Sequence, residues 1–216
     1  MKINEALNVK TTQHGRKPVN IFVGRFQPFT LGHTKVIEQL YRENNLPTVI
    51  ILVKSKKKGR EDSFKRPYSE EMQIRMIQKV KRDYPIEDVI VLPNAAIDKI
   101  FNELRPDYEP VLWGTGTDRM KSYGYQVNRQ EYRDDLNVHP DFSLFEIKRT
   151  GKNISATKVR NALLDNDKEK FERYTPNSIH DMFSELREIL REGMKREGLL
   201  ESKNYVLSYE QFIKNN

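Results

Sequence analysis

Strand-sized apolar runs alternate along the chain with longer segments whose apolar residues recur every three or four positions. The runs that predict strands are 20–24, 48–53, 88–92, 110–113 and 142–147. The segments that predict helices are 31–42, 69–82, 96–104 and 155–164. The second run is almost continuously apolar, as expected of a strand buried on both faces in a parallel sheet. Strands that alternate with helices predict an α/β fold with right-handed crossover connections.

The pattern changes after Arg173, where no further strand is evident. Apolar residues there recur at helical spacing with charges between them: Ile179, Met182, Phe183, Leu186, Ile189 and Leu190. Because an amphipathic helix must bury its apolar stripe, we expect this one to pack on the sheet domain or, failing that, to form an oligomer contact. We divide the chain into an N-terminal tail (1–17), an α/β domain (18–173) and a helical C-terminal extension (174–216).

Composition excludes several classes of protein. The chain has no cysteine, so disulfides and thiolate zinc sites are excluded, and its four histidines are too scattered for a paired ligand motif. No apolar run approaches the roughly 20 residues of a membrane span, and residues 1–17 lack the apolar block of a secretory signal. We therefore expect a cytoplasmic protein with no membrane contact and no metal ligands of its own.

The charge balance favours an anionic ligand. Lys and Arg number 38 against 31 Asp and Glu, which gives a formal net charge of +7 and favours contact with polyanions or phosphate-bearing small molecules. The densest basic cluster runs from Lys54 to Arg66. Three interpretations of this cluster are open: a clamp for a phosphorylated substrate, a nucleic-acid patch or a solvated loop. Charge runs are most often solvated loops.

Residues 24–33, Gly-Arg-Phe-Gln-Pro-Phe-Thr-Leu-Gly-His, lie where the first predicted strand ends and a helix begins. Ligands of open α/β sheets bind at the carboxyl ends of the strands. Gly24 lets the backbone approach a ligand, and Thr30 can cap the helix. Gly32 leaves room beside His33, which can donate a hydrogen bond to a phosphate at the helix start. The string is not a Walker loop, because no lysine follows its second glycine.

Residues 154–160, Ile-Ser-Ala-Thr-Lys-Val-Arg, lie between the last predicted strand and its helix. Ser155 or Thr157 can cap this helix or bind a ligand at its start. Arg160 lies one turn further and is long enough to lean back toward the N-terminus. The arrangement favours a phosphate clamp, although capping alone also explains the Ser and the Thr.

Residues 113–119, Trp-Gly-Thr-Gly-Thr-Asp-Arg, follow the fourth predicted strand. That strand should border the first one across the switch point of the sheet, so we expect a loop here that faces the ligand. Asp118 can accept hydrogen bonds from a ribose, and backbone groups near Gly116 can contact a base, with Arg119 beside them. The alternative is a plain turn that Asp118 caps.

Together these segments resemble the signature of the nucleotidyltransferase superfamily. Its first motif is His or Thr, any residue, Gly, His, and its last is Ile-Ser-x-Thr-x-x-Arg; residues 30–33 and 154–160 match every specified position. Residues 24–29 are similar to the nicotinamide mononucleotide adenylyltransferase branch, whereas cytidylyltransferases more often have Gly-Thr-Phe-Asp. Residues 116–118 resemble the Gly-x-Asp element of the family. The resemblance covers the α/β domain and not the extension.

The resemblance implies a Rossmann-like three-layer domain that transfers AMP from ATP to nicotinamide mononucleotide, forming NAD and releasing pyrophosphate. Catalysis would depend on His33, Thr30 and Arg160, with Mg²⁺ entering with the triphosphate. Arg25 is either a second cation for the phosphates or a surface residue. The residues implied to bind the nucleotide are Gly24, Arg25, Phe26, Gly32, Gly116, Asp118, Arg119, Ser155 and Thr157.

The acceptor is the less well-defined substrate. Residues 66–75 are similar to the Asn-Pro-Phe-Thr helix start of archaeal-type adenylyltransferases but carry Arg66 in place of Asn. Trp113 and Tyr68 are candidates to stack on a pyridine ring or a base, although buried aromatics are more often core. We expect ATP and a phosphorylated acceptor as partners and no specific nucleic acid; a homo-oligomer is compatible with the sequence.

Two alternatives remain open at this point. One is a cytidylyltransferase that acts on a phosphoalcohol or a sugar phosphate, against which Gln27 in place of Asp argues weakly. The other is a non-catalytic module that binds a nucleotide or, through the basic cluster, nucleic acid.

Overall fold

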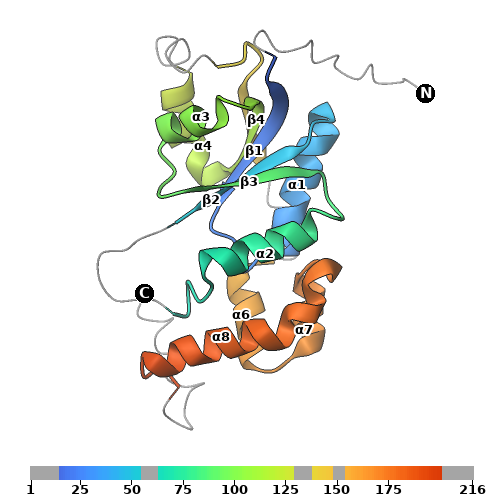
Figure 1. Ribbon diagram of the computed structural model, residues 1–216, viewed down its shortest axis with the longest axis vertical. Coiled ribbons are helices and arrows are strands. Elements are labelled where there is room, and N and C mark those ends of the chain that lie inside the picture. Colours follow the sequence, from blue (N-terminus) through green and yellow to red (C-terminus); the bar gives the residue numbers. More distant parts are fainter. Residues whose placement is uncertain (1–14, 55–62, 129–137, 148–153, 201–216) are drawn as a thin grey trace, which may run out of the picture.

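Five parallel strands form one sheet in the order β3-β2-β1-β4-β5 (Figure 1). The computed structural model describes residues 15–54, 63–128, 138–147 and 154–200; the predicted tail up to residue 14, residues 55–62 of the basic cluster and the chain after residue 200 lie outside them. The strands are β1 (Lys17–Gly24), β2 (Thr48–Val53), β3 (Ile86–Leu92), β4 (Tyr108–Gly116) and β5 (Ser143–Ile147).

The strand order reverses between β1 and β4. From β1 the chain proceeds outward through β2 to β3, and it then returns to the other side of β1 to add β4 and β5. The prediction that the fourth strand borders the first is confirmed. A ligand site in such a sheet lies outside the carboxyl ends of the strands at this switch point.

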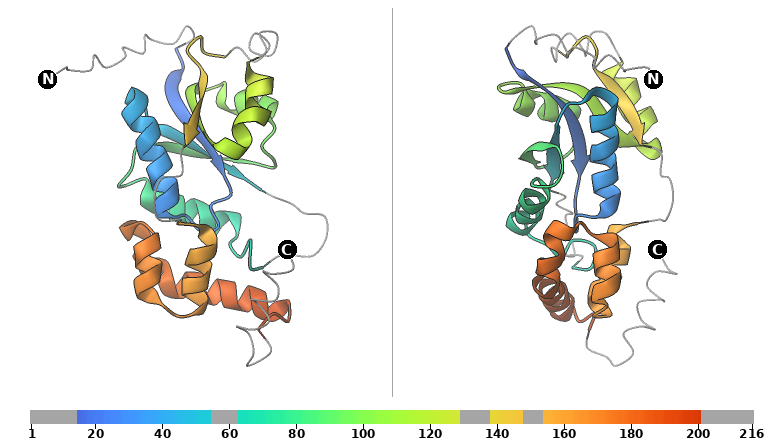
Figure 2. Two further views of the ribbon diagram at one scale, coloured as in Figure 1. Left: turned by 180° about the vertical axis from the view of Figure 1, so that it is seen from behind. Right: turned by 90° about the vertical axis from the view of Figure 1, so that its right-hand side faces the viewer.

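Helices cover both faces of the sheet, which makes three layers (Figure 2). The helices α1 (Leu31–Asn44) and α2 (Glu70–Val80) pack on one face. The helices α3 (Ile97–Leu104) and α4 (Thr117–Val127) pack on the other. Alternate residues of β2 serve the two sides, since Ile50 joins the core under α2 while Ile51 joins the core under α3. The predicted Rossmann-like α/β fold is confirmed.

The last described elements are a group of helices below the sheet in Figure 1: α6 (Ala156–Leu164), α7 (Lys168–Tyr174), η1 (Asn177–Met182) and α8 (Phe183–Arg196). The apolar stripe predicted for this region packs into the core that α2 and α6 also line, with Leu186 and Leu190 fully buried. Two surface ion pairs, Arg75–Glu185 and Lys79–Asp181, join α8 and η1 to α2. No helix among the described residues is long and apolar enough to cross a membrane.

Two helices, α7 and α4, were not predicted. The helix α7 is short and charged, with Phe171 as its buried apolar residue, so its periodicity is weak. The prediction of a loop over residues 113–119 was wrong, because β4 continues to Gly116 and α4 begins at Thr117. The glycines there stay in the strand because β5 pairs with them and because Leu40 of α1 fills the space over Gly114, where a Cβ atom would lie 2.9 Å from it.

Candidate active site

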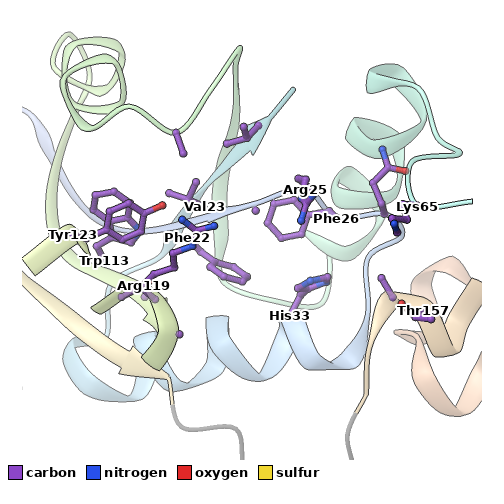
Figure 3. Close-up of a pocket in the computed structure, with 18 of the residues that line it drawn as sticks. Phe22, Val23, Arg25, Phe26, His33, Lys65, Trp113, Arg119, Tyr123 and Thr157 are labelled. Atoms are coloured by element: carbon purple, nitrogen blue, oxygen red, sulfur yellow. The ribbon is translucent and has the colours of Figure 1, made fainter. Parts of the chain in front are cut away.

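A cavity of about 1010 Å³ opens at the carboxyl ends of β1 and β4 (Figure 3). Its walls come from these strand ends and from the first turns of α1, α4 and α6, so the switch point of the sheet is hollow. The structure brings most of the predicted site residues together in this wall. They are Gly24, Arg25, Phe26, His33, Trp113, Gly116, Arg119, Thr157 and Arg160.

The wall is strongly cationic. Four of its side chains carry a positive charge, Arg25, Lys65, Arg119 and Arg160, and none of the described lining residues is a carboxylate. In Figure 3 the labelled cations are spread along the cavity, with Arg119 at the end near Trp113 and Lys65 at the end near Thr157. A cavity charged in this way suits a polyanionic ligand such as a triphosphate.

His33 projects from the first turn of α1 into this cavity and has a defined tautomer. The backbone N–H of Thr30 donates to its Nδ1 at 3.0 Å. Because Nδ1 accepts, the proton of the neutral ring lies on Nε2. Thr30 itself is buried at the N-cap position of α1 and does not line the cavity, so it orients His33.

Three phenylalanine rings surround the His33 imidazole. The ring centroids of Phe26, Phe29 and Phe22 lie 4.9, 5.1 and 6.0 Å from it. This burial lowers the pKa of His33 from 6.5 to about 4. At neutral pH the site therefore presents a neutral Nε2–H donor, and its positive charge comes from the Arg and Lys side chains.

Arg160 is held in place by contacts with the motif loop, with α6 and with the segment that precedes α2. Its guanidinium donates to the backbone carbonyl of Gln27 and, at 3.0 Å, to Oγ1 of Thr157. The ring of Phe64 lies against it, with 4.8 Å between Cζ and the ring centroid. These contacts fix the guanidinium plane at the wall between α6 and the motif loop.

The motif glycines leave space for protein groups. Phe26 has a left-handed backbone with φ of 45°, and its ring folds back so that a Cβ atom on Gly24 would lie 2.8 Å from it. Gly32 lies outside the described lining, and a Cβ atom there would lie 3.2 Å from the carbonyl oxygen of Ile154. Gly32 therefore lets α1 approach the start of α6, which brings His33 and Arg160 into one cavity.

Two other predicted residues are placed as follows. Ser155 caps α6, since its side chain accepts from the backbone N–H of Lys158 at 3.3 Å, and it is not among the lining residues. Asp118 lies in the first turn of α4, but its side chain lies outside the described part of the structure.

The predicted aromatic candidates lie in different cavities. Trp113 is fully buried and stacks on Tyr123 of α4, with 4.5 Å between ring centroids and 28° between planes. Tyr68 lines a smaller neighbouring cavity of about 280 Å³, together with Arg25 and Gln27. The two rings therefore cannot sandwich one ligand. Tyr123, which is partly exposed, is the ring that the Trp113 end of the large cavity offers to a ligand.

Tyr123 and Phe64 were missed by the sequence analysis, which named Lys65 only as part of the basic cluster from Lys54 to Arg66. Tyr123 would have been found had α4 been recognised, because it lies almost two turns after Thr117 on the helix that begins where β4 ends. Phe64 and Lys65 lie near the end of the basic cluster and precede α2. No motif marks them, since their place depends on packing against the C-terminal helices.

Gln27 has a structural role that its position in the motif does not reveal. Its side-chain amide accepts from the backbone N–H of Tyr68 at 3.0 Å and donates to the carbonyl of Tyr68 at 2.8 Å. This pair of hydrogen bonds ties the motif loop to the segment that leads into α2. Burial raises the pKa of the Tyr68 hydroxyl, which stays protonated and donates to the carbonyl of Leu186 at 3.4 Å.

Comparisons with known proteins agree with this geometry. The family model for cytidylyltransferase-like proteins matches residues 21–162. The nicotinic acid mononucleotide adenylyltransferase of Plasmodium falciparum, complexed with NaAD, superposes with a TM-score of 0.50 at 18% identity, covering 81% of this chain and 98% of that one. A proposed nicotinate-nucleotide adenylyltransferase from Vibrio parahaemolyticus gives 0.49 at 16% identity, with coverage of 78% and 99%. At 18% identity, the likeness to the Plasmodium falciparum structure shows a shared fold alone.

Proposed function

The chain belongs to the cytidylyltransferase-like family of nucleotidyltransferases, and on that premise we propose that it transfers AMP from ATP to nicotinamide mononucleotide, forming NAD and pyrophosphate. The observation that carries the proposal is the large cavity. It combines four cationic side chains, a neutral imidazole donor and the first turns of three helices with no described carboxylate in its wall.

The reaction needs no protein nucleophile. A phosphate oxygen of the mononucleotide attacks the α-phosphorus of ATP, and the bond from that phosphorus to the oxygen of the leaving pyrophosphate breaks. Both the attacking and the leaving oxygens are anionic, so no proton has to be removed. The protein's task is to hold the phosphates in line and to stabilise the added charge.

The residues of this chain divide that task. The Nε2–H of His33 donates to a phosphate oxygen at the start of α1, and Arg160 and Lys65 supply positive charge at the start of α6. Mg²⁺ enters as part of the magnesium–triphosphate substrate. In the described residues no group of three or more His, Asp or Glu side chains is placed to hold a metal ion, so the phosphates and water are its main ligands.

We assign the ring of the acceptor to the end of the cavity that β4 and α4 form. A pyridinium ring is positively charged and is attracted to an aromatic face, a contact worth about 0.5–2 kcal/mol. Tyr123, backed by Trp113, offers such a face there. The choice of ATP and of a pyridine mononucleotide follows the resemblance of residues 24–29 to that branch of the family.

The test is the initial rate of pyrophosphate release over a matrix of ATP, CTP, GTP and UTP against nicotinamide mononucleotide, nicotinate mononucleotide, phosphocholine and glycerol 3-phosphate. We expect the highest rate with ATP and nicotinamide mononucleotide. Release confined to CTP with a phosphoalcohol would replace the adenylyl proposal with cytidylyl transfer. No release with any pair, from protein that binds ATP, would favour the non-catalytic module.

A further inference from the structure

The helix α8 lies beyond the region that the family model matches, yet it contacts one wall of the active-site cavity. That wall includes Phe64 and Lys65, from the segment 63–68 that precedes α2. At the start of the segment, the backbone N–H of Ser63 donates to Oε1 of Glu197, the C-cap residue that follows α8, at 3.0 Å. At its other end, the Tyr68 hydroxyl donates to the carbonyl of Leu186.

Close packing accompanies these hydrogen bonds. Gly193 of α8 faces Ser63 so closely that a Cβ atom on the glycine would lie 3.1 Å from the Cβ atom of Ser63. Phe64, which is 4% exposed, belongs to the same core cluster as Leu190 and Met194. The helix therefore holds the segment through a hydrogen bond at each end and a shared core between them.

The held segment also contacts a residue of the proposed chemistry. Phe64 lies against the guanidinium of Arg160 at 4.8 Å, and Lys65 adds a cation to the cavity wall. Displacement of Phe64 would remove one of the contacts that hold Arg160. Small displacements of groups that position a reacting phosphate have large effects on the rate.

We propose that α8 is a positioning element of the active site, which acts through Glu197 and Gly193 to hold residues 63–68 so that Phe64 supports Arg160 and Lys65 faces the triphosphate. The part of this inference that concerns the triphosphate rests on the proposed function. The anchoring of the segment does not, so the two are separable by experiment.

The test uses the full chain with Glu197→Ala, Glu197→Gln and, as a matched control, Glu192→Ala at an exposed position of the same helix. Glu197→Ala removes the acceptor for Ser63, whereas Glu197→Gln keeps a carbonyl oxygen there. For Glu197→Ala we expect faster hydrogen exchange of the amides in residues 63–68 and a KM for ATP about three- to tenfold higher, with the KM for the acceptor nearly unchanged. Glu197→Gln and Glu192→Ala should resemble the wild type in both measurements.

A second variant keeps the test independent of the hydrogen bond. Gly193→Ala places a methyl group against Ser63, so residues 63–68 must move by a few tenths of an ångström. Like Glu197→Ala, this variant should raise the KM for ATP. Unchanged exchange over residues 63–68 in Glu197→Ala would overturn the proposal, as would equal effects of Glu197→Ala and Glu192→Ala. Faster exchange in Glu197→Ala together with a wild-type protein that releases no pyrophosphate would leave the anchor in place and refute the proposed function.

Discussion

The two ends of the cavity are built in different ways. Between α1 and α6, His33 and Arg160 are already oriented by hydrogen bonds to the protein, from Thr30 to the imidazole and from the guanidinium to Gln27 and Thr157. Between β4 and α4, the lining is a stacked aromatic pair with an exposed Arg119 beside it. The first end has the rigid donors that transition-state stabilisation needs, and the second has the aromatic surface that suits recognition of a ring. Variants at the first end should therefore change kcat or the kinetic constants for ATP, and variants at the second should change the KM for the acceptor.

The largest effect is expected from His33→Ala. The variant removes the Nε2–H donor from the phosphate site, so kcat should fall by about 100- to 1000-fold, the usual cost of losing a donor aimed at transition-state charge. Steady-state kinetics and circular dichroism on the same sample measure the effect. Lys35→Ala, at an exposed position on the same helix, is the control. A well-folded His33→Ala protein with full activity would make His33 a packing residue and remove the distinction between the two ends.

Arg160→Lys should have the next largest effect. Lysine keeps the charge but cannot donate in one plane to both Gln27 and Thr157, so the cation is no longer fixed at the wall. We expect kcat/KM for ATP to fall by about 10- to 100-fold. Arg25→Lys, at an exposed residue that lines the same cavity, tests whether orientation or charge alone decides. An Arg160→Lys protein with the kcat/KM of the wild type would show that charge alone matters.

Tyr123→Ala addresses the recognition end. Loss of the ring should raise the KM for nicotinamide mononucleotide by about 3- to 10-fold, in line with the strength of a cation–π contact, with a smaller change in the KM for ATP. Tyr123→Phe keeps the ring and should behave as the wild type. Tyr123 is a sharper probe than Trp113, because replacing the fully buried Trp113 by alanine would also destabilise the core by about 3–5 kcal/mol. A larger rise in the KM for ATP would place the nucleoside of ATP at this end.

The smallest effect concerns pH. With a His33 pKa of about 4, the imidazole stays neutral from pH 6 to 8, so its ionisation should leave kcat unchanged over this range. The folded protein binds fewer protons at His33 than the unfolded chain between pH 4 and 6.5. His33 therefore stabilises the fold above pH 6.5, and this contribution is lost as the pH falls toward 4. Urea unfolding at pH 7 and pH 5 should show a smaller pH effect in His33→Ala than in the wild type; an equal effect would contradict the lowered pKa.

The same contrast explains what could be predicted from sequence. The strand β2 and the helix α1 have unambiguous periodicity, and the residues at 30–33 and 154–160 owe their place to local strand-to-helix turns. Local sequence therefore determines where His33 and Thr157 lie in their strand-to-helix turns. The parallel sheet then brings the two turns to the same edge.

The remainder depends on contacts between distant segments. The predicted fourth strand was shorter than β4, because a glycine at position 114 suggested a turn. Gly114 lies in the strand because Leu40, which is distant in sequence, packs over it. Phe64 and Lys65 join the site because α8 holds them, across more than a hundred residues of chain, as the hydrogen bond from Ser63 to Glu197 illustrates. Spacing within the sequence cannot reveal packing of this kind.

The account's central claim is that this cavity joins ATP to a pyridine mononucleotide. Its most direct test is the parallel measurement of pyrophosphate and dinucleotide in one reaction of the wild-type protein with magnesium–ATP and nicotinamide mononucleotide. The account predicts that NAD and pyrophosphate appear in equal amounts, and that the His33→Ala, Arg160→Lys double variant forms neither at a comparable rate. Pyrophosphate without dinucleotide, or products formed only from CTP and a phosphoalcohol, would contradict it.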